Sequence, residues 1–276
     1  RSYPGNTVGF HSVTTQSEVE VSVKSNIKSI HENRYWVELD RRSIFSCLSM
    51  NVGAEESVVF EKISAFATSR DKNCKAVDAA LFLDDAVDCG YDKLFSESKE
   101  DWEKFWSDNK INIKSDNAFY QQAVNFSLYH LRIMNNRDDS RLGIGAKALS
   151  GEGYKGHSFW DTEIFIFPYF VCNDPIAARR LLEYRYSLLE KCREKAHKYG
   201  YSGAMYPWES AWVDDGETCP YIGEPDVATG EQRINKMGEI EVHINADIAY
   251  AVWYYYAITN DEDFMEKYGN EMVLEI

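Results

Sequence analysis

Residues 149–165 read LSGEGYKGHSFWDTEIF, a glycine-rich start followed by a polar aromatic end, and the apolar run 164–170 overlaps and extends it. Placing that polar end beside a buried run is costly unless its hydrogen bonds are satisfied. A sugar would satisfy them, because carboxylates accept hydroxyl hydrogen bonds and an indole offers an apolar face and one donor. The alternative is a helix cap, in which Asp161 or Ser158 holds free amides and Trp160 packs in the core.

A second stretch of the same character follows at 205–217, which reads MYPWESAWVDDGE. It pairs Trp208 with Glu209 beside Pro207, whose ring restricts the backbone. The alternative is a solvated acidic loop that two tryptophans anchor. Two separate tryptophan–acid pairs favour carbohydrate recognition, and paired carboxylates are also what the cleavage of a glycosidic bond requires.

The residues before these stretches predict β-structure. From 17 to about 68, apolar and polar residues alternate with period two in the segments 19–23, 35–39 and 58–63, with polar turns between them. This pattern is typical of antiparallel strands. The segment 99–106, with its aromatic residues on one side, predicts a linking helix.

After Lys114 the apolar period becomes 3.6, which predicts helices. Either Ser115 or Asp116 can cap the first of them. Its apolar stripe consists of Phe119, Ala123, Phe126 and His130.

A stronger start signal is Asp174-Pro175, because a carboxylate accepts free amides and proline fits the first helical position. We expect this helix to end at Gly200, with further helices over 239–258 and 264–276. The apolar stripe of the helix that begins at Pro175 consists of Ala177, Leu181, Tyr184, Leu188 and Cys192. Several helices joined by long loops predict an α-helical barrel or bundle after a β domain.

Composition excludes several classes of protein. The chain has 276 residues and a formal charge of −15, so nucleic-acid and anionic-membrane partners are disfavoured. It lacks a run of about 18 apolar residues that could span a bilayer. The six histidines show neither His-x-x-x-His nor His-Glu-x-x-His spacing, so His157 with Asp161, or Glu239 and Glu241 with His243, are weak candidates for a metal site, and we expect no metal.

The six cysteines are scattered, which favours free thiols in a reducing compartment and hence the cytoplasm. They are Cys47, Cys74, Cys89, Cys172, Cys192 and Cys219. The chain opens on Arg-Ser-Tyr-Pro-Gly, with neither an initiating methionine nor a secretory signal pattern, and the pattern over 264–276 lacks a helix stop signal. We therefore expect a piece of a longer protein.

Stretch 149–165 resembles the signature of glycoside hydrolase family 65, which includes the inverting phosphorylases of maltose, trehalose, kojibiose and nigerose. The stretch 201–210, YSGAMYPWES, resembles the second conserved stretch of that family, at a matching distance. A third resemblance lies at 243–251, HINADIAYA, although threonine is more usual where Asn245 stands.

The first half shares the resemblance, which therefore extends over nearly the whole chain. Segment 61–70 and the helix with Trp102 and Trp106 look like the end of the family's N-terminal β-sandwich and its linker. The implied fold is mixed β then all-α, the C-terminal part of a β-sandwich followed by the first part of an (α/α)6 barrel. The implied domains are part of the sandwich at 1–85, the linker at 86–114 and the incomplete barrel at 115–276.

The resemblance also implies roles for individual residues. Trp160 and Asp161 would form the subsite for the donor glucose, and Trp208 and Glu209 would border the scissile bond and the acceptor. We expect His157 and Asn245 to be further substrate-binding residues. No catalytic residue is expected within this chain, because the family's proton donor, a Glu in a Gly-Pro-Asp-Glu-type stretch, and its phosphate loop would lie beyond Ile276. Neither Glu209 nor Glu163 is assigned as that acid.

The implied activity is inverting phosphorolysis of an α-linked glucose disaccharide to β-glucose 1-phosphate and an acceptor sugar. Phosphate replaces the activated water of a hydrolase, so one carboxylic acid suffices. Phosphate is then a co-substrate, no cofactor is implied, and a homodimer is one assembly open to the intact protein. Two alternatives remain, an α-glucoside hydrolase of the same family and a non-catalytic sugar-binding module. Because a barrel closes only when its last helices pack against its first, we expect an isolated piece to expose the stripe of Ala177, Leu181, Tyr184 and Leu188.

Overall fold

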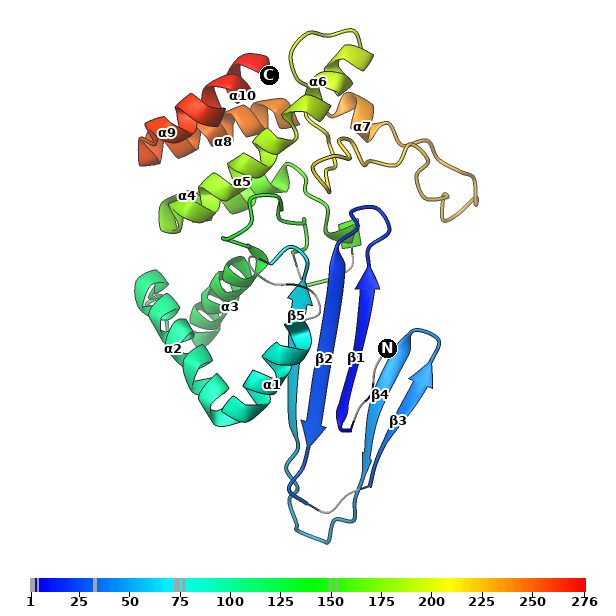
Figure 1. The fold of residues 1–276 in the computed structure, drawn as a ribbon. Coiled ribbons are helices and arrows are strands. Elements are labelled where there is room, and N and C mark those ends of the chain that lie inside the picture. The colour runs from blue at the N-terminus through cyan, green and yellow to red at the C-terminus, as the bar shows by residue number, and fades with distance from the viewer. Residues whose placement is uncertain are drawn as a thin grey trace. The chain divides into compact units, whose positions relative to one another are not determined.

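The computed structural model describes residues 3, 5–31, 34–71, 75, 78–148, 150–151 and 153–276 (Figure 1). Cys74 and, in the first motif, Leu149 and Glu152 lie outside the described residues. The chain divides into two compact units, Arg1–Lys110 and Ile111–Ile276. Among the helices described, none combines the length and the apolar character needed to cross a membrane.

The first unit contains the predicted antiparallel strands. Three of them form a sheet in the order β1 (Thr7–Val13), β2 (Glu20–Lys28) and β5 (Glu61–Thr68), and β3 (Arg34–Asp40) pairs with β4 (Ser43–Ser49) as a hairpin. The alternation in β5 buries every second residue, as period two requires. The strand expected over 58–63 begins only at Glu61, where pairing with Lys28 starts.

Among its described residues this unit also contains two α-helices, α1 (Ala79–Cys89) and α2 (Tyr91–Asn109). Leu83 of α1 packs against Ile63 and Ala65 of β5, so α1 covers the inner face of that strand. Gly90, with a φ of 80°, permits the sharp turn between the helices. The helix predicted over 99–106 lies within α2 and is confirmed.

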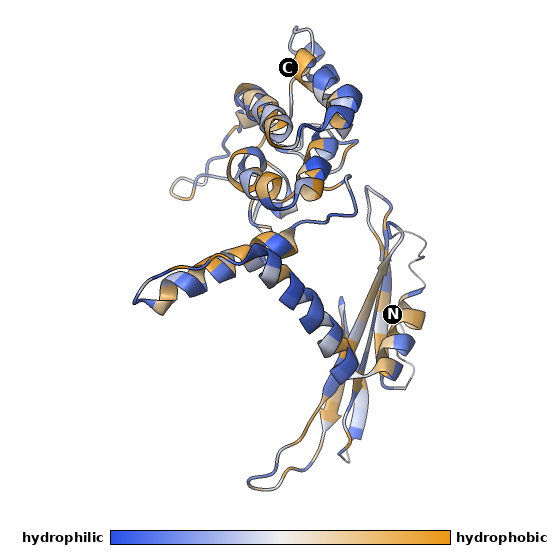
Figure 2. Ribbon diagram, turned by 90° about the vertical axis from the view of Figure 1, so that its left-hand side faces the viewer, coloured by the Kyte–Doolittle hydropathy of each residue, from blue (hydrophilic) through white to orange (hydrophobic). Residues whose placement is uncertain are grey.

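The second unit is helical. Figure 2 shows hydrophobic and hydrophilic residues mixed along its helices. The helices are α3 (Ala118–Met134), α4 (Phe167–Asn173), α5 (Pro175–Ser187), α6 (Leu189–Lys198), α7 (Met237–Ile240), α8 (Ile244–Thr259), α9 (Glu262–Phe264) and α10 (Asn270–Glu275). A 3-10 turn, Gly153–Gly156, and two π-helical turns, Thr162–Ile166 and Met265–Gly269, complete the set.

Helix starts follow the capping rules, with one correction. Asp174 accepts the Ala177 amide at 3.2 Å and Pro175 is the first residue of α5, as predicted. The cap of α3 is Asn117, whose Oδ1 accepts the Phe119 amide at 3.0 Å. The predicted caps Ser115 and Asp116 are wrong, because the helix begins later and Ser115 Oγ instead accepts the Asn117 amide.

Two of the predicted helices are each divided into two helices in the structure. The helix predicted to run from Pro175 to Gly200 consists of α5 and α6, which meet at Leu188. The helix predicted over 239–258 is interrupted, since α7 ends at Ile240 and α8 begins at Ile244. That interruption places His243 at the N-terminus of α8.

The core of the second unit lies between α4, α5 and α8, which pack side by side (Figure 1). The prediction that the α5 stripe would be exposed is wrong. Ala177, Leu181, Tyr184 and Leu188 are at most 2% exposed, because α4 and α8 cover them within this chain.

Candidate functional site

A backbone bridge joins the two tryptophan–acid stretches. The Ser158 amide donates to the Ser210 carbonyl at 2.8 Å, and the Ser210 amide donates back to Ser158 at 3.0 Å. Both serines are buried. Residues 52 positions apart in sequence therefore enter the site in fixed register.

The backbone before this bridge is unusual. Tyr154 and Lys155 have positive φ angles of 61° and 56°, a region that side chains with a Cβ disfavour. Gly145 lies so close to Gly156 that an added Cβ would approach its backbone to 2.9 Å. Disfavoured conformations of this kind cluster at functional sites, where the surrounding structure holds them.

The structure brings two of the predicted site residues, His157 and Glu209, into contact. The Nδ1 atom of His157 lies 2.5 Å from Oε1 of Glu209, and the Glu209 side chain is only 11% exposed. Among the described residues Oε2 of Glu209 has no protein partner, so it can accept a hydrogen bond from a ligand. The link fixes the direction of the carboxylate from the opposite stretch.

The two tryptophans converge on one histidine. The His243 ring centroid lies 5.2 Å from Trp160 and 5.6 Å from Trp208, in edge-to-face contact with both. Its Nδ1 lies 2.7 Å from the Asp247 carboxylate, and its Nε2 lies 3.5 Å from Glu241. Sequence reasoning did not assign His243 to the site, although it begins the third conserved-looking stretch and its neighbour Asn245 was selected.

Asp161 does not cap a helix. It stands at the start of the π-helical turn Thr162–Ile166, but its side chain accepts no hydrogen bond from the free amides there. No other donor within the described residues bonds to it, and it is half-buried. The cap interpretation is therefore wrong for Asp161, as it is for Ser158, which pairs as an extended residue instead.

Glu163 has a different environment. It forms a two-pronged ion pair with Arg185 at 2.8 Å, and both side chains are 1% exposed. Arg185 also donates to the Phe159 carbonyl and to Ser210 Oγ, so its buried side chain connects the two stretches. Burial acts to lower the pKa of Arg185, but the Glu163 carboxylate outweighs it and holds the pKa above its usual value. Glu163 is thus the buried counter-ion of Arg185, and this pairing does not suit a proton donor.

Asn245 uses both ends of its amide on the second stretch. Its Oδ1 accepts the Tyr206 amide at 2.8 Å and its Nδ2 donates to the Ala204 carbonyl at 3.0 Å. The side chain therefore ties the N-terminus of α8 to the loop that carries Trp208. Its predicted contact with substrate stays a prediction.

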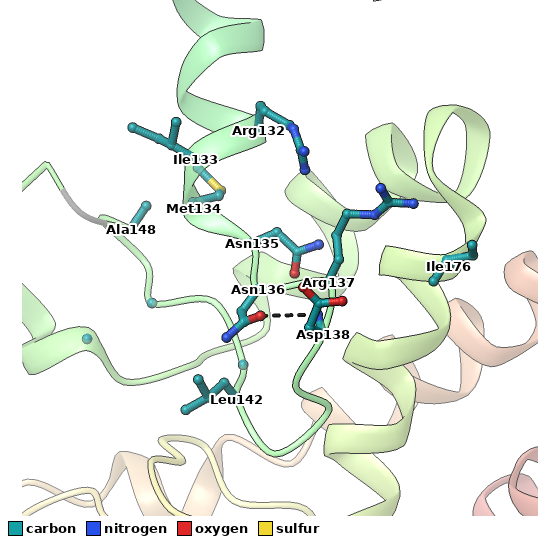
Figure 3. Close-up of a pocket in the computed structure, with 13 residues that line it drawn as sticks. Arg132, Ile133, Met134, Asn135, Asn136, Arg137, Asp138, Leu142, Ala148 and Ile176 are labelled. Carbon is teal, nitrogen blue, oxygen red and sulfur yellow. Dashed lines mark hydrogen bonds between the residues drawn. The ribbon is translucent and has the colours of Figure 1, made fainter. Parts of the chain in front are cut away.

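A hollow of about 750 Å³ lies at the C-terminal end of α3 (Figure 3). The C-terminal end of α3 and the following segment, Arg132 to Asp138, form one wall, and Gly143, Gly145 and Gly156 form another. Gly156 directly precedes His157, but the tryptophan–acid residues themselves do not line it. The tryptophan–acid cluster and this hollow are therefore two separate features, adjacent in sequence at Gly156 and His157. Within the described part of the chain, His, Cys, Asp and Glu side chains do not gather in threes or more to hold a metal ion.

Comparison with known families gives a match for each half of the chain. Residues 125–276 match the glycosyl hydrolase family 65 central catalytic domain, and residues 1–105 match the N-terminal domain of the same family. The first match alone extends over more than half of the chain.

Individual relatives agree. The chain is 46% identical over 245 residues to a kojibiose phosphorylase of Halothermothrix orenii, which covers 85% of this chain and 31% of that protein. It is 37% identical over 272 residues to the kojibiose phosphorylase of Escherichia coli, covering 96% and 36%. The chain thus spans about a third of the length of these curated relatives.

A solved structure shows the same fold. The putative kojibiose phosphorylase from human microbiome superposes with a TM-score of 0.72 at 23% identity, covering 99% of this chain and 35% of that one.

Proposed function

The chain belongs to glycosyl hydrolase family 65, and from that premise we propose that the intact protein is an inverting phosphorylase of an α-linked glucose disaccharide. The curated relatives are named as kojibiose phosphorylases, which supports a glycoside phosphorylase. In this proposal the first unit is the C-terminal part of a β-sandwich, and the second is the first part of an (α/α)6 barrel.

One observation carries the proposal. Trp160 and Trp208 meet at His243, and each is followed in sequence by a carboxylate that has an oxygen without a partner among the described residues. Apolar ring faces beside acceptors are what a sugar ring requires, since its C–H face is apolar and its hydroxyls are donors. A solvated acidic loop would not need tryptophans from two stretches to contact one histidine.

The proposed roles follow from this geometry. Trp160 and Asp161 hold the donor glucose, with the open carboxylate of Asp161 accepting its hydroxyl hydrogen bonds. Trp208 and Glu209 border the scissile bond and the acceptor, and His157 orients Glu209 through the 2.5 Å contact.

The reaction needs one acid and one nucleophile. Phosphate oxygen attacks the anomeric carbon from the face opposite the glycosidic oxygen, that C–O bond breaks, and a carboxylic acid protonates the departing oxygen. The products are β-glucose 1-phosphate and the free acceptor sugar. We place the acid and the phosphate loop beyond residue 276, because the family's Gly-Pro-Asp-Glu-type stretch does not occur in this chain.

The test uses the intact protein and a panel of α-linked glucose disaccharides with and without phosphate. Proton and phosphorus NMR should detect β-glucose 1-phosphate only when phosphate is present. Free glucose released at an equal rate without phosphate would establish the hydrolase instead. Sugar binding without turnover in either buffer would establish the binding module.

A further inference from the structure

The carboxylate of Glu217 is the centre of a hydrogen-bond cluster under the second tryptophan–acid pair. Its Oε2 accepts the Trp208 amide at 2.8 Å, and its Oε1 accepts the Glu209 amide at 3.0 Å and the Cys219 amide at 3.2 Å. The ammonium of Lys195 lies 2.6 Å from Oε2. One carboxylate therefore binds the backbone of both members of the pair.

Lys195 holds this carboxylate in place. It lies on α6, its side chain is 8% exposed, and its Nζ also donates to the Tyr206 carbonyl at 3.1 Å. The ammonium thus connects the core helix to the loop on one side and to Glu217 on the other. A buried ammonium with a carboxylate partner and an additional acceptor is a stable arrangement only when these contacts are kept together.

The surrounding backbone is shaped around Glu217. Thr218 donates to the Glu209 carbonyl through both its amide and its hydroxyl, each at 2.9 Å. A Cβ added at Gly238 would lie 3.0 Å from Cδ of Glu217, so glycine leaves the space that this side chain fills. The residues that constrain Glu217 thus come from α6, from its own loop and from α7.

We propose that Glu217, anchored by Lys195, is a positioning residue that fixes the direction of Trp208 and Glu209. The inference rests on the function proposed above, because it assumes that this pair contacts the substrate. Trp208 and Glu209 belong to a long irregular loop, so their side-chain directions depend on what binds their backbone. Hydrogen bonds to an ionised acceptor are about twice as strong as neutral ones, and Glu217 accepts one from the backbone amide of each residue.

Glu217→Gln in the intact protein tests this role. The change keeps the size of the side chain but places an NH2 group against donors, so one of the two amides loses its acceptor. We expect kcat/KM to fall between about tenfold and a hundredfold, the effect of a small misplacement of binding groups. The matched control is Glu194→Gln, an exposed α6 residue paired with Lys191, which should keep wild-type kinetics.

A second readout separates positioning from general destabilisation. Saturation with glucose should change the intrinsic fluorescence, and the difference between wild type and Trp208→Phe gives the part due to Trp208. In Glu217→Gln this part should be lost at a temperature where circular dichroism shows a folded protein. Glu217→Asp keeps the charge beside Lys195 but is too short to reach both amides. It should show the same losses of kcat/KM and of the Trp208 fluorescence change. This variant decides the question if Glu217→Gln does not fold.

The outcomes are distinct. Active wild-type protein whose Glu217 variants keep wild-type kcat/KM, or lose activity while the Trp208 signal is unchanged, would overturn the positioning role alone. Wild-type protein without phosphorolysis on any disaccharide of the panel would overturn the proposed function, and this inference with it.

Discussion

At the scale of single residues, the carboxylate of Asp161 gives the most direct test of the site. It stands where a helix cap would stand, yet it accepts no hydrogen bond there. Asp161→Asn in the intact protein should therefore leave thermal stability unchanged. A hydrogen bond to a charged acceptor contributes roughly 1.5–3 kcal/mol, so steady-state kinetics should show kcat/KM reduced at least about tenfold.

The result distinguishes a ligand contact from a structural one. A lower melting temperature with unchanged kcat/KM would mean that Asp161 stabilises the fold after all. Asp101→Asn, on an exposed residue of α2, is the matched control and should change neither quantity.

The Glu163–Arg185 pair has the opposite expectation, because it is buried on every side. Removing one partner leaves an uncompensated charge, so Arg185→Met should lower the free energy of unfolding by about 3–5 kcal/mol. Arg180→Met, which breaks the partly exposed pair with Glu183, should cost no more than about 1 kcal/mol. Thermal unfolding of the intact protein measures both, and equal melting temperatures for the two variants would contradict the assignment.

The sequence predicts which residues come together better than how they are arranged. Tryptophan beside a carboxylate marks Trp160, Asp161, Trp208 and Glu209, because few buried environments other than a ligand site combine these groups. His243 could not be found in this way, since its place between two indoles depends on the interruption of a helix. In the sequence Glu217 is one more acid of a solvated loop, because no local pattern predicts its ion pair with Lys195.

At the scale of elements, local chemistry predicts helix starts when the signal is unambiguous. Asp174-Pro175 combines a cap with a residue suited only to the first turn, and α5 begins there. Ser115, Asp116 and Asn117 are all capable caps, so the sequence does not choose among them. In the structure Asn117 Oδ1 accepts the Phe119 amide, while Ser115 Oγ accepts the Asn117 amide.

The turn between α8 and α9 predicts a pH dependence. Oδ2 of Asp261 accepts the Tyr255 hydroxyl at 2.7 Å and Arg179 at 2.9 Å, and its Oδ1 caps Phe264 at 3.0 Å. Partial burial acts to raise the pKa of Asp261, but these three contacts outweigh it and hold the pKa below the usual 3.8. Because the folded pKa is depressed, this carboxylate stabilises the fold above its unfolded pKa and ceases to do so as pH falls through the folded value.

Asp261→Asn measures that contribution. Wild type should melt at a higher temperature than the variant near pH 7, and the difference should shrink as pH falls below 3.8. Differential scanning calorimetry over a pH series gives the two curves. A difference that stays constant down to the acid limit would show that the charge of Asp261 contributes nothing to stability.

At the scale of the whole molecule, the distribution of exposed apolar side chains matters more than the α5 stripe. That stripe is buried within the chain, but four other aromatic side chains are each at least 59% exposed. They are Phe119 and Phe126 of α3, Phe165 of the π-helical turn before α4, and Trp253 of α8. Soluble monomers rarely expose large contiguous apolar patches, and apolar faces without a partner drive association. In our proposal these faces pack against the remainder of the catalytic domain.

A polypeptide of residues 1–276 alone should therefore self-associate, whereas the intact protein should give one defined species. Sedimentation velocity at increasing protein concentration distinguishes the two cases, because association by exposed faces grows with concentration. The same polypeptide should show no phosphorolysis, since the acid and the phosphate loop are placed beyond its last residue. A monomeric, mass-verified polypeptide that released β-glucose 1-phosphate would overturn both expectations and move the acid to Glu209, whose Oε2 is the one open carboxylate oxygen of the second pair among the described residues.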